Sequence, residues 1–348
     1  MPDIASVDRN FQVKGVSDGN TVWFDCLRPP FRVYGLAHDG ERFRRMPLSV
    51  ARTVNPGTEN LAAHTAGGRL RFVTDSPVIS IRAVMDRICR MPHFALTGTA
   101  GFDLYADGVF CGAFVPPFDM QEGYTSTLNF GAKARREILI HFPTYSGVRS
   151  LEIGLAPDAM VTEAPAYRSP LPFVTYGSSI TQGGCVSRPG NCYQNILSRE
   201  LQWDHINLGF AGNARGEQTM AEYISALPMQ ALILDYDHNA PDAEHLQKTH
   251  EPFFRLIREK RPALPILLLP RPKAVLSDVE KKRRDIIRST YEHALADGDR
   301  HVHYIEMSDF LRSFCGNDGT VDNCHPNDLG FRGMAAAILP WLRAAPEA

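Results

Sequence analysis

The sequence of 348 residues contains no apolar run long enough to cross a lipid bilayer. Its seven cysteines are few for this length and odd in number, which excludes a disulfide scaffold as the basis of the fold. The formal net charge of −2 gives no electrostatic reason to expect nucleic acid or an anionic membrane as a partner. Nothing in the sequence decides whether the chain forms a homo-oligomer.

Residues 1–8 lack the basic and apolar regions of a signal peptide. Together with at least one unpaired cysteine, this favours a cytoplasmic location, or export if a leader has been removed. Apolar residues make up 44% of the chain and charged residues 22%, as in ordinary globular proteins. The length is sufficient for two domains, each with a core of its own.

The first half of the sequence is predicted to be β-structure. Turn signals such as Asn55-Pro56-Gly57 and Ala106-Asp107-Gly108 separate its apolar segments, and no long helical period interrupts them. The clearest strand segments alternate or are β-branched: Arg69–Thr74, Val78–Val84, Gly101–Tyr105 and Glu137–Phe142. Many short strands with regular turns predict a two-sheet β-sandwich, which we place at residues 1–157.

Four prolines, at positions 157, 165, 170 and 172, then punctuate a stretch with little periodicity, and we interpret residues 158–172 as a linker. In residues 173–348, apolar runs alternate with helical patterns, which predicts an α/β domain with a parallel sheet and helices on both faces. The predicted strands are Phe173–Tyr176, His205–Leu208, Ala231–Leu234, Pro265–Leu269 and Val302–Ile305. The predicted helices are Cys192–Leu201, Gln218–Ala226, Ala243–Lys260, Asp278–Ala296 and Asn327–Leu342.

The most informative motif follows the first strand of the second half. An apolar run ends at Gly177, and Ser178 and Ser179 follow where a strand should open into a loop. Far downstream, Asp322 and His325 lie three residues apart. Serine, histidine and carboxylate are the nucleophile, base and orienting group of a serine hydrolase. Either serine alone could simply cap a helix, but the Asp-x-x-His pair favours the catalytic interpretation.

These motifs resemble those of the SGNH (GDSL-type) hydrolases. Gly177-Ser178-Ser179-Ile180 is similar to the Gly-Asp-Ser-like block of that family, and Asp322-x-x-His325-Pro326 is similar to its Asp-x-x-His block. The Gly-x-Ser-x-Gly elbow of α/β-hydrolases is absent. The resemblance implies a C-terminal α/β/α domain on a flavodoxin-like parallel sheet. It also implies that Ser179 is the nucleophile, His325 the general base and Asp322 the carboxylate that orients the base.

The resemblance further implies an oxyanion hole. SGNH families take one donor from a backbone glycine N–H after the second strand and another from an asparagine side chain after the third. Gly212 and Asn239 match those positions, and the Ser179 N–H would complete the hole. Gly209 competes with Gly212, and Asn239 lacks the usual Gly-x-Asn-Asp context. A turn glycine and a helix-capping asparagine are the alternative interpretations.

A second resemblance concerns the first half of the chain. Gly101-Phe102-Asp103-Leu104-Tyr105 is similar to the Gly-x-Asp-Leu-Tyr motif of a β-sandwich module that precedes the hydrolase domain in one SGNH subfamily. Residues 141–148 and 151–154 resemble the end of that module. The resemblance implies a jelly-roll-like N-terminal domain and a substrate of the carbohydrate O-acyl ester class.

A metal enzyme is a rival hypothesis, because acids and histidines gather between residues 235 and 250: Asp235, Asp237, His238, His245 and His250. Their spacing matches no zinc signature such as His-Glu-x-x-His. A solvated or packed histidine is the simpler interpretation, and serine-based ester hydrolysis needs no metal or organic cofactor. We therefore expect neither.

Taken together, the motifs predict a serine esterase, and the family resemblance implies that it hydrolyses short-chain O-acyl esters, above all O-acetyl esters, of a carbohydrate, as a small molecule or an oligosaccharide. Two alternatives stay open. The same triad could serve an acyltransferase, because an acyl-serine intermediate is common to hydrolysis and transfer. The chain could also be a non-catalytic carbohydrate-binding protein whose hydrolase fold is only a scaffold.

Overall fold

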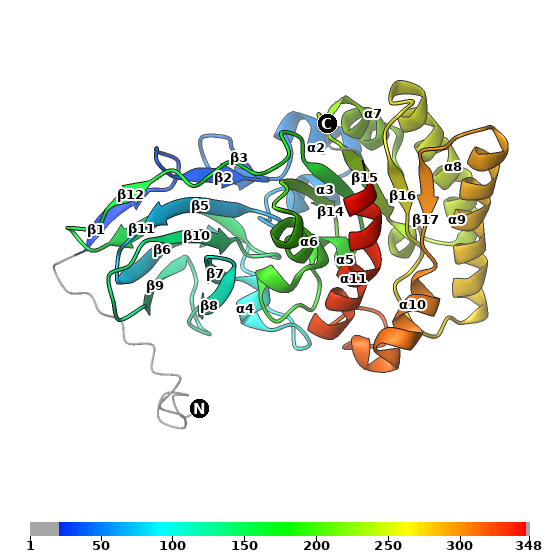
Figure 1. Cartoon of the computed structure of the whole chain (residues 1–348). Coiled ribbons are helices and arrows are strands. Elements are labelled where there is room, and N and C mark those ends of the chain that lie inside the picture. The colour runs from blue at the N-terminus through cyan, green and yellow to red at the C-terminus, as the bar shows by residue number, and fades with distance from the viewer. Residues whose placement is uncertain (1–20, 346–348) are drawn as a thin grey trace.

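The computed structural model describes residues 21–345. Two antiparallel sheets form the first part of the chain, and a parallel sheet with helices on both faces forms the second part (Figure 1). The predicted α/β fold with a preceding β-sandwich is thereby confirmed. The first eight residues, which bear on export, lie outside the described range. Among the described residues, no helix combines the length and the apolar character that a bilayer span requires.

The antiparallel sheets pack face to face around one apolar core. The first sheet has the order β1 (Val22–Asp25), β11 (Gly147–Leu155), β6 (Val78–Asp86) and β9 (Gly123–Asn129). The second has the order β12 (Val161–Thr162), β5 (Arg69–Thr74), β10 (Arg136–His141), β7 (Phe102–Ala106) and β8 (Val109–Phe114), with β2 (Arg32–Tyr34) also paired to β5. Alternate residues such as Leu70, Phe72 and Ile81 fill the space between the sheets, as the period of two predicts.

The parallel sheet positions the motifs of the second half. Its order is β14 (His205–Gly209), β13 (Phe173–Gly177), β15 (Ala231–Asp235), β16 (Ile266–Leu268) and β17 (Val302–Tyr304). In chain order this is 2-1-3-4-5, the flavodoxin-like arrangement. Gly177 pairs with Gly209 on one side and with Asp235 on the other, so the carboxyl ends of three strands meet at one edge. The switch in strand order lies there, where such sheets bind ligands.

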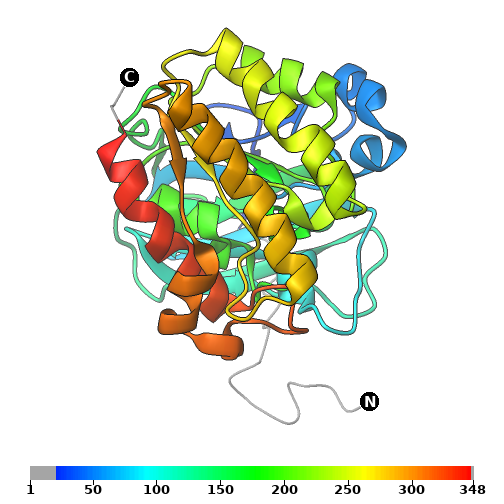
Figure 2. The same cartoon turned by 90° about the vertical axis from the view of Figure 1, so that its right-hand side faces the viewer.

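Helices cover both faces of this sheet (Figure 2). One face packs against α7 (Gln218–Ala226), α8 (Ala243–Lys260) and α9 (Asp278–Ala296), and the other against α6 (Tyr193–Leu201) and α11 (Asp328–Ala344). Neighbouring residues of β15 alternate between the two cores, because successive strand side chains point to opposite faces. The caps match the predicted starts: Asp242 caps α8, Ser277 forms a capping box with Glu280 in α9, and Asn327 caps α11.

Several short helices lie where the sequence showed no helical period. They are α2 (Leu48–Val54), α3 (Pro56–Leu61), α4 (Leu96–Thr99), α5 (Ser179–Gln182) and α10 (Met307–Phe314). The interpretation of Asn55-Pro56-Gly57 as a turn between strands was wrong. Asn55 caps α3 through a hydrogen bond from the Thr58 N–H, and Pro56 is its first residue. Helices of one or two turns are too short to reveal a period of 3.6 residues.

The hairpin of β3 (Ala37–His38) and β4 (Phe43–Arg44) leads into α2 and α3, which pack against each other, and α2 lies beside α7 (Figure 1). Met46, Ala51 and Leu61 belong to the core beneath the parallel sheet and not to the core of the sandwich. Part of the first half of the chain therefore completes the hydrophobic core of the second half.

Candidate active site

Ser179 is placed by the sharp exit of β13 from the sheet. The strand ends at Gly177, where an added Cβ would lie 2.2 Å from the Asp235 carbonyl oxygen, so only glycine fits between these strands. Ser178 is buried and caps α5, since its hydroxyl accepts a hydrogen bond from the Ile180 N–H at 3.1 Å. Ser179 is therefore the first residue of α5, where a backbone N–H has no partner within the helix.

The loop before α11 brings His325 to Ser179. The His325 Nε2 lies 2.9 Å from the Ser179 Oγ, and its Nδ1 lies 2.8 Å from an Asp322 carboxylate oxygen. The other oxygen of Asp322 accepts hydrogen bonds from the backbone N–H groups of Cys324 at 3.0 Å and His325 at 2.7 Å. Asn323 takes a positive φ of 61°, which lets the chain fold back on the carboxylate.

Partial burial acts to raise the pKa of the Asp322 carboxyl, but hydrogen bonds from the His325 N–H and imidazole outweigh it, and the pKa is lowered. Asp322 therefore stays ionised and holds a proton on Nδ1 of His325. The other nitrogen is left as an acceptor that faces the serine hydroxyl. The three side chains predicted as a triad thus form one continuous chain of hydrogen bonds.

The two predicted oxyanion donors also meet at this sheet edge. The Gly212 N–H donates to the Asn239 Oδ1 at 3.1 Å, and the Asn239 Nδ2 donates to the Phe210 carbonyl at 2.7 Å. An amide nitrogen carries two hydrogens, so Asn239 keeps one to offer. The Gly212 N–H has a single hydrogen, and it can reach a substrate oxygen only by leaving Asn239. Gly212 is exposed and has a positive φ of 71°.

Gly209, the competing glycine, has a packing role. An added Cβ would lie 2.2 Å from the Gln182 backbone nitrogen, so a side chain here would push α5 out of place. Its N–H donates to the Asn207 Oδ1 at 2.9 Å, and its carbonyl accepts from Arg45. Burial of the Arg45 guanidinium lowers its pKa to about 9. The Gly209 N–H is buried and bonds to Asn207, whereas the exposed Gly212 N–H bonds to Asn239 at the site, so Gly212 is the better candidate.

A buried ion cluster fixes the turn that carries Asn239. This turn is η3 (Asp237–Asn239), and the Asp237 carboxylate accepts hydrogen bonds from Arg271 at 3.2 Å and from Arg283 at 3.1 Å. Burial acts to raise the pKa of Asp237, but the neighbouring positive charges outweigh it and lower the pKa. On the same turn, the His238 Nδ1 lies 3.6 Å from the Cys324 Sγ, in the loop of His325. The contact between His238 and Cys324 therefore links the Asn239 turn to the His325 loop.

The first half of the chain contributes residues that the sequence did not assign to the site. The Tyr145 hydroxyl donates to the Ser179 carbonyl at 3.0 Å. The ring of His93 lies 6.1 Å from the ring of His325, centre to centre. Tyr145 belongs to the segment 141–148 that resembles the end of the sandwich module, so that motif was a usable signal. His93 lies in an irregular loop after β6, and no sequence motif pointed to it.

The acids and histidines of the rejected metal hypothesis are separately engaged. His250 bonds to Thr290 at 2.8 Å, His245 bonds to the Arg215 carbonyl at 2.9 Å, and Asp237 holds its arginines. The Asp235 Oδ2 accepts from the Thr181 hydroxyl at 2.9 Å, while its Oδ1 is buried without a partner. Burial raises the pKa of Asp235 well above its usual range.

This buried acid predicts a pH dependence of stability. The pKa of Asp235 is higher in the folded state than the unfolded value of about 3.9. The contribution of the protonated side chain to folding stability is therefore fully present below about pH 3.9 and is lost as pH rises toward the folded pKa. The Asp235→Asn variant should gain stability relative to the wild type by up to about 1.4 kcal/mol per pH unit over that window. Chemical denaturation from pH 5 to pH 9 measures the difference, and parallel curves would contradict the prediction.

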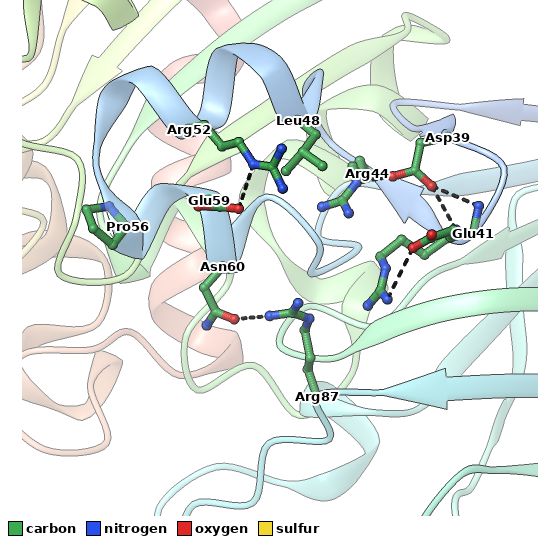
Figure 3. Close-up of a pocket in the computed structure, with 10 residues that line it drawn as sticks. Asp39, Glu41, Arg44, Leu48, Arg52, Pro56, Glu59, Asn60 and Arg87 are labelled. Atoms are coloured by element: carbon green, nitrogen blue, oxygen red, sulfur yellow. Dashed lines mark hydrogen bonds and ion pairs between the residues drawn. The ribbon is translucent and has the colours of Figure 1, made fainter.

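A hollow of about 690 Å³ lies away from this site, between the β3–β4 hairpin, α2, α3 and the end of β6 (Figure 3). Neither Ser179 nor His325 lines it. Its arginines are already engaged: Arg52 pairs with Glu59, Arg87 with Asn60, Arg44 with Asp39 and Arg42 with Asp86. Three of these arginines thus meet a carboxylate, whereas Arg87 meets only the neutral amide of Asn60.

Two family models match the chain, one in each half. Residues 171–343 match the model of the GDSL-like lipase/acylhydrolase family. Residues 21–161 match the model of the N-terminus of Esterase_SGNH_hydro-type proteins, the GxDLY module. No curated protein sequence matches the chain.

Solved structures share the whole architecture. A putative GDSL-like lipase from Bacteroides ovatus is 28% identical with a TM-score of 0.83, and the match covers 93% of this chain and 98% of that one. The salicylyl-acyltransferase SsfX3 from a tetracycline biosynthetic pathway is 21% identical with a TM-score of 0.77, covering 94% and 99%. The acetyl xylan esterase Est2A from Butyrivibrio proteoclasticus is 12% identical with a TM-score of 0.56, covering 93% and 98%. The last two show likeness of fold alone.

Proposed function

Since the chain belongs to the SGNH (GDSL-type) hydrolases, in the subfamily with an N-terminal GxDLY module, we propose that it is a serine esterase that cleaves short-chain O-acyl esters through an acyl-serine intermediate. The observation that carries the proposal is the chain of hydrogen bonds from the Ser179 Oγ to the His325 Nε2 at 2.9 Å and from the His325 Nδ1 to Asp322 at 2.8 Å.

The proposed reaction begins with proton transfer from Ser179 to the Nε2 of His325, as the Oγ attacks the ester carbonyl. Asp322 keeps the Nδ1 protonated and stabilises the imidazolium. The carbonyl oxygen becomes negative and is met by the Ser179 N–H, the free hydrogen of the Asn239 amide and the Gly212 N–H once it turns from Asn239. His325 then protonates the leaving alcohol and activates the water that releases the acid.

The contribution of Asn239 to the oxyanion can be tested directly. The Asn239→Ala variant should lower kcat about 100- to 1000-fold with a smaller effect on KM, since the oxygen is fully negative only in the transition state. Steady-state kinetics on an activated acetate ester measures the change. The matched control is Asn129→Ala, because Asn129 is exposed in β9 and its side chain accepts a local hydrogen bond from the Gly131 N–H, away from the site. A kcat of wild-type size in folded Asn239→Ala protein would remove Asn239 from the mechanism.

For the substrate, we propose acetyl esters of a carbohydrate. Support comes from the fold shared with an acetyl xylan esterase and from the loop of the sandwich that approaches His325 through His93. Such a wall favours a compact acyl group over a long lipid chain. Release of acid from a panel of acetylated sugars and of aryl esters of increasing chain length tests this, with Ser179→Ala as the blank. Faster cleavage of long-chain esters than of acetate would overturn the acyl preference.

Acyl transfer to an alcohol is the second candidate function, and the fold shared with the acyltransferase SsfX3 favours it. The acyl-enzyme is the same, and only the acceptor differs. Adding sugar alcohols to the ester assay and measuring the ratio of transfer product to free acid distinguishes the two. Water is present at about 55 M, so the acceptor at millimolar concentration is at a large disadvantage. An excess of transfer product over free acid under these conditions would therefore favour the transferase.

A further inference from the structure

The mouth of the site contains three metal-binding side chains from separate parts of the chain. One nitrogen of His93, one nitrogen of His325 and the Cys185 sulfur all lie within 4.8 Å of one another. Imidazole and thiolate are the ligands that Zn²⁺ prefers among protein groups. The carboxylate of Asp322, which is hydrogen-bonded to His325, adds a negative charge beside these ligands.

His325 is already arranged as a metal ligand. Histidines that bind metals almost always donate their other ring N–H to a carboxylate or a carbonyl, which fixes the tautomer. The Nδ1 of His325 donates to Asp322 in this way at 2.8 Å. Only Nε2 is left for a metal, and this is the nitrogen that faces the Ser179 Oγ at 2.9 Å. A metal and the serine proton would therefore compete for one lone pair.

His93 is available as the second ligand. It is exposed, and among the described residues its one contact of note is the ring of His325. It sits in a tight turn closed by the Met91–Phe94 bridge, and Phe94 packs edge-on against Tyr145 with ring centres 5.2 Å apart. The turn is thus anchored, while the imidazole of His93 is exposed to solvent.

Cys185 supplies the third ligand from the loop after α5. The residue is buried and has a positive φ of 73°, an uncommon backbone for a residue other than glycine. Burial raises the pKa of its thiol to about 12, so the free protein holds it as a thiol. Coordination to Zn²⁺ deprotonates a thiol outright, and the proton passes to solvent.

We propose that Zn²⁺ binds reversibly at the side chains of His93, Cys185 and His325 and thereby inhibits the enzyme. Three dative bonds form to the ion, the thiol proton of Cys185 is released, and no electron is transferred. Tetrahedral zinc places its ligand atoms roughly 3.3–3.8 Å apart, so the three donors, all within 4.8 Å of one another, need at most a small approach. With Nε2 occupied, His325 cannot accept the serine proton. The inhibition rests on the proposed esterase function, whereas the binding does not.

Calorimetric titration of the full chain with Zn²⁺ tests the site. We expect His93→Ala and Cys185→Ala each to weaken Zn²⁺ binding at least about tenfold. Loss of a residue that only hydrogen-bonds to a metal ligand already weakens metal affinity by about that factor. The matched controls are His301→Ala and Cys111→Ala, which remove an exposed histidine and an exposed cysteine elsewhere. Co²⁺ should give the wild type a sulfur-to-cobalt charge-transfer band that Cys185→Ala lacks. If Cys185→Ala fails to fold, the exposed His93 still provides the test.

The same proteins are then assayed for ester cleavage with and without Zn²⁺, each against its own metal-free rate. Reversible inhibition of the wild type, relieved by a chelator and shifted to higher Zn²⁺ in His93→Ala, supports the proposal. Equal Zn²⁺ affinity and equal inhibition in the wild type, His93→Ala and Cys185→Ala would overturn it. Zn²⁺ binding at these residues in a protein that cleaves no ester would support the metal site and overturn both the inhibition and the proposed function.

Discussion

Ser179→Ala should lower kcat for ester cleavage by a factor on the order of 10⁴ to 10⁶, because the acyl-serine intermediate cannot form without the hydroxyl. The stability of the variant should be close to that of the wild type. Among the described residues, the Ser179 Oγ bonds only to the His325 Nε2, so its loss leaves no buried polar group of the core without a partner. Steady-state rates on an aryl acetate and thermal unfolding of the same samples measure the two effects.

The neighbouring serine provides a matched control. Ser178→Ala removes the cap of α5 and should cost about 1 kcal/mol of stability, with a much smaller loss of rate. The two substitutions thus separate a structural serine from a reacting one in adjacent positions. Ser179→Ala protein that keeps most of the wild-type rate would show that the hydrogen-bonded chain to Asp322 does not carry the reaction.

The long regular elements were predictable because burial imposes a period on them. Three of the predicted helices, Gln218–Ala226, Ala243–Lys260 and Asp278–Ala296, have the bounds found in the structure. Each covers the sheet with one apolar face, which a sequence records directly. The short α2 and α3 were not predicted, since their apolar residues serve a core formed mainly by residues more than a hundred positions away.

At the site, the sequence revealed the residues whose chemistry requires a fixed type and spacing. Asp322 and His325 lie on one loop, so three residues of separation suffice for their contact. The hydrogen bond from the Gly212 N–H to the Asn239 Oδ1 joins two loops that are distant in the sequence. No local pattern could show that these two groups bind each other. The approach of His93 depends on how the sandwich docks, which is a property of the tertiary structure.

The docking of the sandwich gives a physical role to the Gly-x-Asp-Leu-Tyr motif. Asp103 is fully buried, and its carboxylate binds the His141 Nδ1 at 2.7 Å within the sandwich. It also accepts hydrogen bonds from the Arg188 side chain and the Gly190 N–H, both at 2.8 Å, in the loop that follows Cys185. The Tyr105 hydroxyl accepts from the same Arg188 at 2.6 Å. The motif therefore connects the sandwich to the loop that borders the candidate site.

Asp103→Asn is expected to destabilise the protein by about 3–5 kcal/mol, the usual cost of removing one partner of a buried ion pair. Burial acts to raise the pKa of Asp103, but its interactions with His141 and with the Arg188 guanidinium outweigh burial and lower the pKa, so the carboxyl is ionised in the folded state. Asparagine keeps the shape of the side chain but leaves Arg188 without its counter-charge. Chemical denaturation at pH 7, followed by fluorescence, measures the loss.

Asp158→Asn is the matched control, because Asp158 pairs with Lys133 on the surface and is exposed to solvent, so this substitution should change stability little. The sign of the pH effect adds a second test. A depressed pKa stabilises the fold above the unfolded value of about 3.9, and this contribution is lost as pH falls through the folded pKa. The stability difference between the wild type and Asp103→Asn should therefore shrink in acid. The stability difference could instead be small at pH 7, or could stay constant as the carboxyl is protonated. Either result would mean that the hydrogen bonds of the side chain, and not its buried charge, hold the sandwich to the loop of Arg188.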